Sequence, residues 1–455
     1  MKIRPQKAFE LFAASAMALV LSGPVVQAET LGDALVSAYR TSGLLKQNQA
    51  VLRAADEDVA SSIATLRPVI SYVASGQYAK SNIGLTRNGT QALSLDWTLY
   101  DFGRSQAGVA IARETVLATR QALIGVEQDV LLTAVRAYMD VRRSAQNVTI
   151  QRNSVNVIEE QLGAANDRFS LGEITKTDVA LAEARLAAAK AALAAARGDL
   201  EVARASYKAV MGHEWDGRTN SPARPAFPMT LAEAQALAQK LHPAVRQAQH
   251  QAKVADLQVE LAKAQHRPSI NLNISGFESD SATVPDSSAA LQLTQPLFTG
   301  GKIASGERKA IAGRDAARAA LTLTSVNVAQ QVAVSWAAVD VARAQIAATN
   351  QQIAAAQSAY DGTKEEAELG ARTTLDVLDA QRELLSAQSD RTAAEANLQV
   401  AFYALMSSMG LLTAEHLKLG VPLYDPEAYY DVVKKAPISS QGAKLDKVLK
   451  AIGAD

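Results

Sequence analysis

Two kinds of periodicity alternate along this chain, and each kind occurs twice. Apolar and polar residues alternate with period two at positions 70–75 and 93–99, and again at 270–275 and 291–297. Such alternation is typical of β-strands with one apolar face. The pattern predicts two β-hairpins whose strands are about ten residues long, the length that a tilted strand needs to cross a bilayer. Residues 87–90, Arg-Asn-Gly-Thr, are the predicted turn of the first hairpin, because Asn-Gly favours tight turns.

A long helical segment follows each predicted hairpin, from 103 to near 169 and from 302 to near 368. With a rise of 1.5 Å per residue, either segment would form a rod of roughly 100 Å if it is unbroken. Both segments end at a Leu-Gly pair, at 171–172 and at 369–370. Glycine suits the left-handed position that ends a helix. A returning helix is therefore expected after each break.

The returning helices carry the sharpest pattern in the sequence. Each begins with a capping box, Thr175 with Asp178 and Thr373 with Asp376. Large apolar residues then recur at intervals of seven, interrupted only by Arg391, and an alanine lies three positions after every member of the two series except Leu405. The large residues are Val179, Leu186, Leu193, Leu200, Val377, Leu384, Leu398 and Leu405, and the alanines are Ala182, Ala189, Ala196, Ala203, Ala380, Ala387, Ala394 and Ala401. This is coiled-coil spacing with closely approaching backbones, and taken alone it fits a solvated stalk.

The chain consists of two copies of one plan. The Arg-Pro pair at 67–68 recurs at 267–268, a displacement of 200 positions, whereas residues 99–104 match 297–302 at a displacement of 198. Self-similarity of this kind indicates a repeated structural unit. The slip of two residues falls between positions 68 and 93, where a loop can change length without harm.

Each copy opens with a helix. Capping boxes formed by Thr30 with Asp33 and by Thr230 with Glu233 mark its start. The Arg-Pro pairs mark its end, because proline disfavours helical geometry in the residue before it. Pro243 is expected to kink or divide the helix of the second copy. The boundaries that follow are 1–28 for a signal peptide, 29–211 for the first copy, 212–229 for a linker, 230–411 for the second copy and 412–455 for a C-terminal periplasmic tail.

Composition narrows the possible functions. The first 28 residues have a basic start, an apolar stretch and a small-residue cleavage site before Glu29, as export signals do. A formal net charge of +0 gives no indication of a nucleic-acid partner, and the absence of cysteine excludes disulfides and a lipid on an N-terminal cysteine. After the signal, no apolar run is long enough for a membrane helix. The exported chain is then either soluble or a β-barrel.

Enzyme signatures are missing from the sequence. Gly300-Gly301-Lys302 resembles a phosphate loop only superficially, because Pro296 stands where an earlier glycine is required. The 5 histidines show no metalloprotease spacing. We expect no enzymatic activity, no cofactor and no metal.

Four strands cannot close into a barrel on their own. An open set would leave two edges whose amides and carbonyls are unsatisfied in lipid, at a cost of several kcal/mol per group. If each chain supplies four strands, three chains supply twelve, an even number with room for an aqueous lumen. The fold class expected is an α+β membrane protein, a trimeric 12-stranded β-barrel continued by a long helical barrel.

The chain resembles the TolC-like outer-membrane efflux protein family. The match rests on the strand-to-helix junctions 99–104 and 295–302 and on the tip segments 171–178 and 369–379. The resemblance implies a homotrimer whose barrel lies in outer-membrane lipid and whose helices extend into the periplasm. It also implies a periplasmic adaptor and an inner-membrane RND or ABC transporter as partners. The exported material would be toxic small molecules, type I secreted proteins, or both.

Two acids are implicated by the same resemblance in closing the periplasmic end. Asp376 and Asp379 lie three residues apart on one helix face. They match the family's inward aspartate ring, where acidic side chains favour cations. Asp376 has an alternative role as the capping residue after Thr373. Asp379 has Leu181 as its counterpart in the first copy, so the fold alone does not require an acid there.

Arg372 resembles the arginine that keeps this end closed through charged links, with Asp178 as its acceptor. A surface arginine beside a capping aspartate is the alternative. The tyrosine that accompanies this network in relatives is replaced here by Ala367. The tips expected to dock the adaptor, or alternatively to be simple turns between helices, comprise Leu171, Gly172, Thr175, Thr177, Leu369, Gly370 and Thr373.

A different class of function stays open at this point. A periplasmic coiled-coil adaptor or scaffold without a pore would also be exported and rich in long helices. Adaptors commonly carry one helical hairpin between compact β-domains, whereas this chain has two hairpins and strands of membrane length. The channel is therefore the favoured interpretation, and an exported enzyme is the least favoured.

Overall fold

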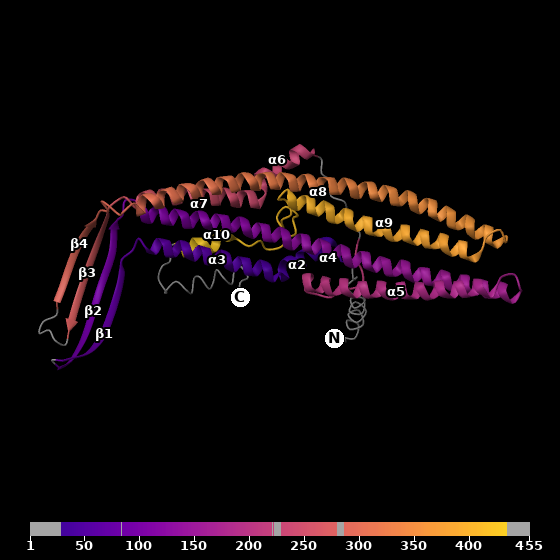
Figure 1. Ribbon diagram of the computed structural model, residues 1–455, viewed down its shortest axis with the longest axis horizontal. Helices are drawn as coiled ribbons and strands as arrows, with labels where there is room; N and C mark the ends of the chain where they lie inside the picture. Colours follow the sequence, from indigo (N-terminus) through magenta and orange to yellow (C-terminus); the bar gives the residue numbers. More distant parts are fainter. Residues whose placement is uncertain (1–28, 83, 221, 223–228, 280–285, 435–455) are drawn as a thin grey trace, which may run out of the picture.

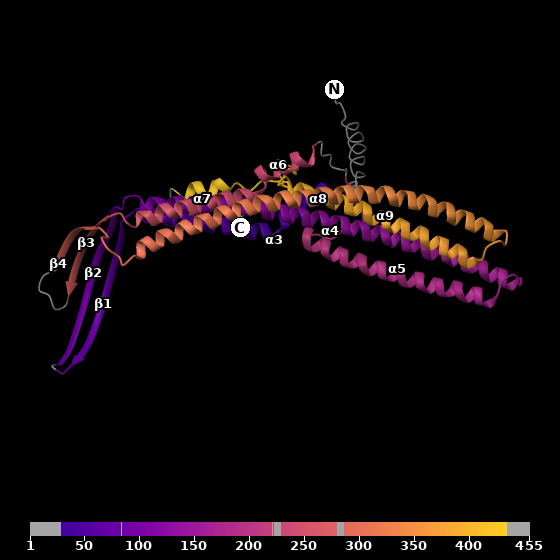
Figure 2. The ribbon, with the colours of Figure 1, turned by 45° about the horizontal axis from the view of Figure 1, so that its top comes forward.

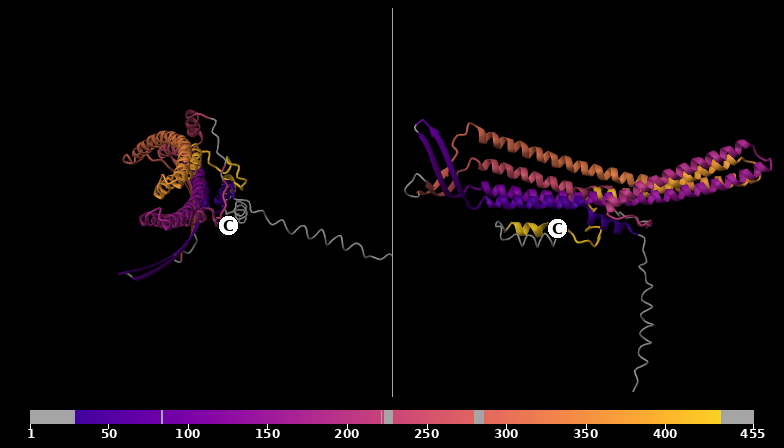
Figure 3. Two further views of the ribbon diagram at one scale, coloured as in Figure 1. Left: turned by 90° about the vertical axis from the view of Figure 1, so that its right-hand side faces the viewer. Right: turned by 90° about the horizontal axis from the view of Figure 1, so that it is seen from below.

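The computed structural model describes residues 29–82, 84–220, 222, 229–279 and 286–434 (Figure 1). Long helices run side by side along most of the molecule, and a four-stranded sheet occupies one end. Viewed along the long axis, the helices form an open arc rather than a closed bundle (Figure 3). The predicted signal segment and the last 21 residues lie outside the described part of the chain.

The sheet contains β1 (Val69–Ser81), β2 (Gly84–Tyr100), β3 (Ser269–Ser279) and β4 (Asp286–Thr294), in that order and antiparallel throughout. One hairpin comes from each copy, as the period-two pattern predicts. The sheet bends away from the helix axis (Figure 2). Within the described residues β1 pairs only with β2 and β4 pairs only with β3, so both outer strands keep a free edge.

The turn predicted at residues 87–90 is wrong. Those residues lie inside β2, where Asn88 pairs with Gln77 and Gly89 with Gly76. The chain reverses between Ser81 and Gly84 instead. Cross-strand pairing over the whole length of β1 outweighs the local turn preference of Asn-Gly, and the strands of this hairpin reach 13 and 17 residues rather than about ten.

The two hairpins have the same register once the two displacements are applied. Val69 pairs with Asp96 in the first hairpin, and Ser269 pairs with Thr294 in the second. The first strand of each hairpin is thus displaced by 200 positions and the second strand by 198. The predicted two-residue slip is confirmed, and it lies between residues 77 and 88 of the first copy, because the two registers agree up to the pairs Gln77 with Asn88 and Phe277 with Asp286.

The longest elements are α4 (Arg104–Ser170) and α8 (Lys302–Glu368), each of 67 residues, and each returns through a shorter helix, α5 (Lys176–Met211) or α9 (Thr374–Ser408). α4 contacts α5 and α9 in the half of the molecule distant from the sheet. The predicted alanine seam is buried there, with Ala182, Ala196, Ala387 and Ala394 all inaccessible to solvent or nearly so. No helix of the described residues combines the length and apolar character needed to cross a membrane.

The opening helix is divided in both copies, into α2 (Leu31–Thr41) and α3 (Gly43–Ala64), and into α6 (Leu231–Leu241) and α7 (Pro243–Ala264). The sequence predicted this for the second copy only. In the first copy the break is stabilised by tertiary contacts: the hydroxyls of Ser37 and Thr41 donate to the carbonyl of Met211, and the Ser42 side chain caps α3. A proline is therefore not required for the division.

The expected polar tail contains a further helix, α10 (Pro426–Val433), which packs on α3. Arg120 of α4 donates to the carbonyl of Pro426 at 3.2 Å and pairs with Glu427 at 3.3 Å. The Tyr429 hydroxyl donates to Glu57 at 2.8 Å. The described part of the tail thus packs against α3 and α4 in the half of the molecule nearer the sheet.

Candidate functional site

The two tips form the end of the molecule opposite the sheet (Figure 1). The left-handed backbone at Gly172, φ 78°, and at Gly370, φ 80°, ends the long helices as the sequence predicts. Leu171 and Leu369, just before these glycines, are among the most exposed apolar side chains of the chain. Each tip therefore presents a leucine to solvent on a turn with fixed geometry.

A complete capping box begins the helix that follows each tip. The Thr373 amide donates to the Asp376 carboxylate at 2.9 Å, and the Asp376 amide donates back to the Thr373 hydroxyl at 3.2 Å. Thr175 and Asp178 form the same pair of bonds in the first copy, at 2.9 and 3.3 Å. These bonds from threonine hold the pKa of Asp376 and of Asp178 below the usual range. Both carboxylates stay ionised in mildly acidic solution.

Asp379 makes a contact that sequence reasoning missed. Its Oδ1 lies 2.8 Å from Nη2 of Arg185 on α5, so this ion pair links the two helical hairpins of one chain. Both side chains are more than one-third exposed, and such pairs contribute about 0 to 1 kcal/mol. The counterpart Leu181 is exposed and apolar. Nothing in the local sequence of α9 points to a partner nearly two hundred residues away.

The structure places Arg372 beside Glu366, with Nε 2.8 Å from Oε2. This hydrogen bond raises the pKa of Arg372. Among the described residues no ion pair joins Arg372 to Asp178, and the Asp178 carboxylate is engaged by Thr175 instead. The closing link between Arg372 and Asp178 is thus not made among the described residues of one chain, and the role of this pair in closing the entrance stays a prediction.

The backbone of Ala367 contacts a residue of the other long helix. Its carbonyl accepts a hydrogen bond from Nη2 of Arg168 at 3.2 Å, which joins the end of α8 to the end of α4. Arg168 was not singled out from the sequence, because a contact made by a backbone carbonyl leaves no side-chain signature. The two tips of one chain are therefore connected by a hydrogen bond from a side chain to a backbone carbonyl, at the position where the family's tyrosine is absent.

A groove runs along α4 between α5 and α9, next to the Arg185–Asp379 pair, with a volume of about 500 Å³. Ile158, Leu378 and Gln381 are among its lining residues. Gln381 is buried, and its Oε1 has no hydrogen-bond partner. Among the described residues no group of His, Cys, Asp and Glu is arranged to hold a metal ion.

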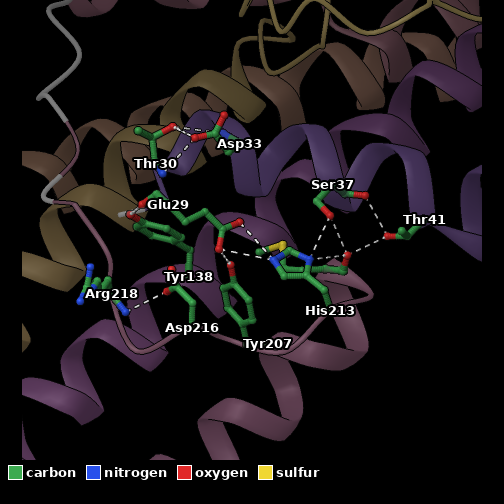
Figure 4. Close-up of polar contacts among 11 residues, drawn as sticks. Glu29, Thr30, Asp33, Ser37, Thr41, Tyr138, Tyr207, His213, Asp216 and Arg218 are labelled. Atoms are coloured by element: carbon green, nitrogen blue, oxygen red, sulfur yellow. Dashed lines mark hydrogen bonds and ion pairs between the residues drawn. The ribbon is translucent and has the colours of Figure 1, made fainter. Parts of the chain in front are cut away.

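A second polar cluster anchors the predicted mature start of the chain (Figure 4). The Tyr207 hydroxyl donates to the Glu29 carboxylate, and Nε2 of His213 lies 3.4 Å from the same group. The Tyr138 hydroxyl lies 2.9 Å from the carbonyl oxygens of Glu29 and Asn220. Burial raises the pKa of Tyr138 to about 12. These contacts tie the first residues to α4, to α5 and to the segment between the copies.

Two matches of one family model cover most of the chain. The model, described as outer membrane efflux protein, matches residues 35–213 and 235–411, which together contain both helical hairpins and all four strands. The chain belongs to the outer membrane efflux protein family. Membership places this efflux-family protein in the outer membrane, extending into the periplasm as an export channel component, and it decides against the pore-free adaptor.

Individual relatives cover nearly the full length. The outer membrane efflux protein BepC of Brucella suis is 35% identical over 436 residues, which are 93% of this chain and 95% of BepC. The proteases secretion protein PrtF of Dickeya chrysanthemi is 25% identical over 431 residues, 88% of this chain and 92% of PrtF. The crystal structure of the outer membrane protein VceC of Vibrio cholerae superposes with a TM-score of 0.71 at 20% identity, covering 84% and 96% of the two chains. The fold of this efflux-family protein is thus that of solved outer-membrane channels.

Proposed function

We propose that three copies of this chain form one channel, with a 12-stranded barrel in the outer membrane and a helical tube through the periplasm. The observation that carries the proposal is the pair of free sheet edges, on β1 and on β4. Unpaired edge groups are costly in lipid, and closure with identical neighbours satisfies them all. Four strands per chain are too few for a barrel, and three chains supply an even number with an open lumen.

The helices support the same assembly. α8 lies at one edge of the arc and exposes an apolar row that no other described element of the chain covers, made up of Leu323, Val326, Val334 and Val341. The opposite edge, formed by α3 and α5, exposes Leu44, Val51 and Val202. Exposed apolar rows on both edges fit a head-to-tail ring of subunits.

The channel is passive in this proposal and works with two partners. A periplasmic adaptor would dock at the tips, where Leu171, Gly172, Thr175 and Thr177 lie on one hairpin and Leu369, Gly370 and Thr373 on the other. An inner-membrane RND or ABC transporter would supply the energy. The exported material in this proposal is toxic small molecules, type I secreted proteins, or both, and it is supported by the name of BepC, an efflux protein, and by that of PrtF, a proteases secretion protein.

We place the constriction at Asp376 and Asp379. Three-fold repetition would bring six carboxylates together, and like charges at close range bind cations rather than remain bare. Half of these charges belong to Asp379 and are offset by Arg185, at 2.8 Å. Asp376 feels the charge of Arg372 but forms no ion pair among the described residues, so we assign the larger share of cation binding to it, and its lowered pKa preserves its charge in mildly acidic solution.

Replacing both acids with alanine should weaken block by divalent cations. The measurement is single-channel current in planar bilayers, titrated with a divalent cation on the periplasmic side, and we expect the half-blocking concentration to rise at least tenfold. Asp33→Ala is the matched control, because it removes a capping carboxylate of the same kind far from the tips. Unchanged block in the double variant would remove the acidic ring from the account.

The export function itself is tested in a deletion strain. The strain should become sensitive to detergents and drugs or should lose secreted protein from the medium, and the purified protein should conduct ions in planar bilayers. A protein that forms no conducting pore and whose loss changes neither phenotype would contradict the proposal.

A further inference from the structure

Two arginines, one from each copy, join the two copies where the sheet meets the helices of a single chain. Nη1 of Arg267 donates to the carbonyl of Phe102 at 2.7 Å. In return, Nη2 of Arg104 donates to the carbonyls of Ala264 and Arg267, at 3.4 and 3.2 Å. The start of α4 in the first copy is thereby fastened to the end of α7 in the second copy.

The residues at the equivalent positions of the other copy do not make this contact within one chain. The internal displacements, 200 for α7 and 198 for α4, map Arg267 to Arg67, Ala264 to Ala64 and Arg104 to Lys302. Among the described residues, neither the Arg67 nor the Lys302 side chain has a hydrogen-bond or ion-pair partner. A Cβ atom added at Gly103 would lie 3.7 Å from Nη1 of Arg267, whereas one added at the equivalent Gly301 would have no atom within 4 Å.

Several residues along α4 and α7 are also more buried than their equivalents along α8 and α3. Gln128 of α4 is 3% exposed beneath its neighbours, whereas Val326, at the equivalent position of α8, is 58% exposed. Ala264 at the end of α7 is buried, and its equivalent Ala64 is exposed. An apolar side chain is thus open to solvent where the other copy buries an amide. This pattern is expected if α8 is covered by an element that the single chain lacks.

We propose that each subunit seam repeats the internal seam between the two copies residue by residue, with α8 packed on α3 of the partner subunit as α4 packs on α7. This inference rests on the proposed ring of identical subunits and adds its register. Lys302 donates to the carbonyls of Ala64 and Arg67 of the partner subunit. Arg67 of the partner subunit donates to the carbonyl of Gly300.

The strand register of the seam follows from the same displacements. Leu95 of β2 pairs with Ile274 of β3, and Asp96 pairs with Asn273. The equivalent pairs between β4 and the partner's β1 are Leu293 with Ala74 of the partner subunit, and Thr294 with Val73 of the partner subunit. Because strand residues alternate between faces, a shift of one residue would place every apolar side chain of β4 on the wrong face.

The chain contains no cysteine, so paired cysteines can test this register without background. Leu293→Cys with Ala74→Cys, and separately Thr294→Cys with Val73→Cys, should form disulfides under mild oxidation and give covalent dimers and trimers on a denaturing gel. Directly opposed strand residues have Cα atoms about 4.5 to 5.5 Å apart, within disulfide range. Inside one chain the pairs are three strands apart, about 14 Å, so only a bond between chains can form.

Leu293→Cys with Ile70→Cys is the control, displaced by four residues, or about 13 Å, along the partner strand. Cross-linking of the control pair, or of neither predicted pair, in a trimer that still conducts would overturn the seam register and leave the proposed function standing. Failure of all variants and of the parent protein to form any oligomer would instead count against the proposed function. Cross-linking of both predicted pairs, with the control remaining monomeric on the gel, supports the seam.

Discussion

Gly410→Ala is expected to abolish assembly of the protein in the outer membrane. Gly410 ends α9 with φ 79°, and a Cβ atom added there would lie 2.8 Å from the Cα of His242 and 3.1 Å from its backbone nitrogen. Backbone atoms cannot move aside as a flexible side chain can. The substitution must therefore separate the end of α9 from the break between α6 and α7, where the second copy is held together.

Gly370→Ala is the matched control. It has almost the same backbone angle, φ 80°, but no atom lies within 4 Å of the added methyl group. Only the strain of a left-handed residue remains, about 1 to 2 kcal/mol. Heat-resistant trimer on gels of membrane extracts should persist for Gly370→Ala and disappear for Gly410→Ala. Equal trimer yields for the two variants would show that the contact at His242 does not matter.

The second large effect concerns pH. Asp56 on α3 is fully buried, and neither of its carboxylate oxygens has a hydrogen-bond partner. Burial raises its pKa to about 6, despite the opposing charge of Arg120. The folded protein therefore holds a proton on Asp56 more tightly than the unfolded chain does. The stability that this proton contributes is complete below pH 3.8 and is lost as the pH rises through about 6.

Asp56→Asn should remove this pH dependence. A shift of roughly two pKa units corresponds to about 3 kcal/mol per subunit lost between pH 4 and 8. We expect the melting temperature of the parent protein to fall between pH 5 and 8 by several degrees more than that of the variant. Asp58→Asn, on the exposed side of the same helix, should keep the parent's pH dependence. Parallel melting curves for Asp56→Asn and its parent across this range would refute the assignment.

The parts of the fold that the sequence predicts correctly are those set by local pattern. The long helices end within a few residues of the predicted positions because the Leu-Gly pairs act on their own turns, and the returning helices begin at their predicted capping boxes. The repeat also predicts that the two hairpins share one register. These features depend on residues that are close in sequence, or on a pattern that occurs twice.

The errors arise where distant residues decide. The Asn-Gly pair at 88–89 lies inside β2 because pairing with β1 continues past it. The helix break at Ser42 is stabilised by hydrogen bonds to the carbonyl of Met211, and the ion pair of Asp379 is made with Arg185 of another helix. The capping role of Asp376 was visible, since its partner Thr373 is three residues away. Its proposed inward position in the channel depends on other subunits and could not be derived from the sequence of one chain.

The number of chains in one particle tests the central claim most directly. Native mass spectrometry of the protein extracted in detergent, after signal removal, should give a single species that contains three chains. This trimer should dissociate only on strong heating. A folded monomer that remains stable without detergent or lipid would contradict the account, because the free edges of β1 and β4 would then need no partner.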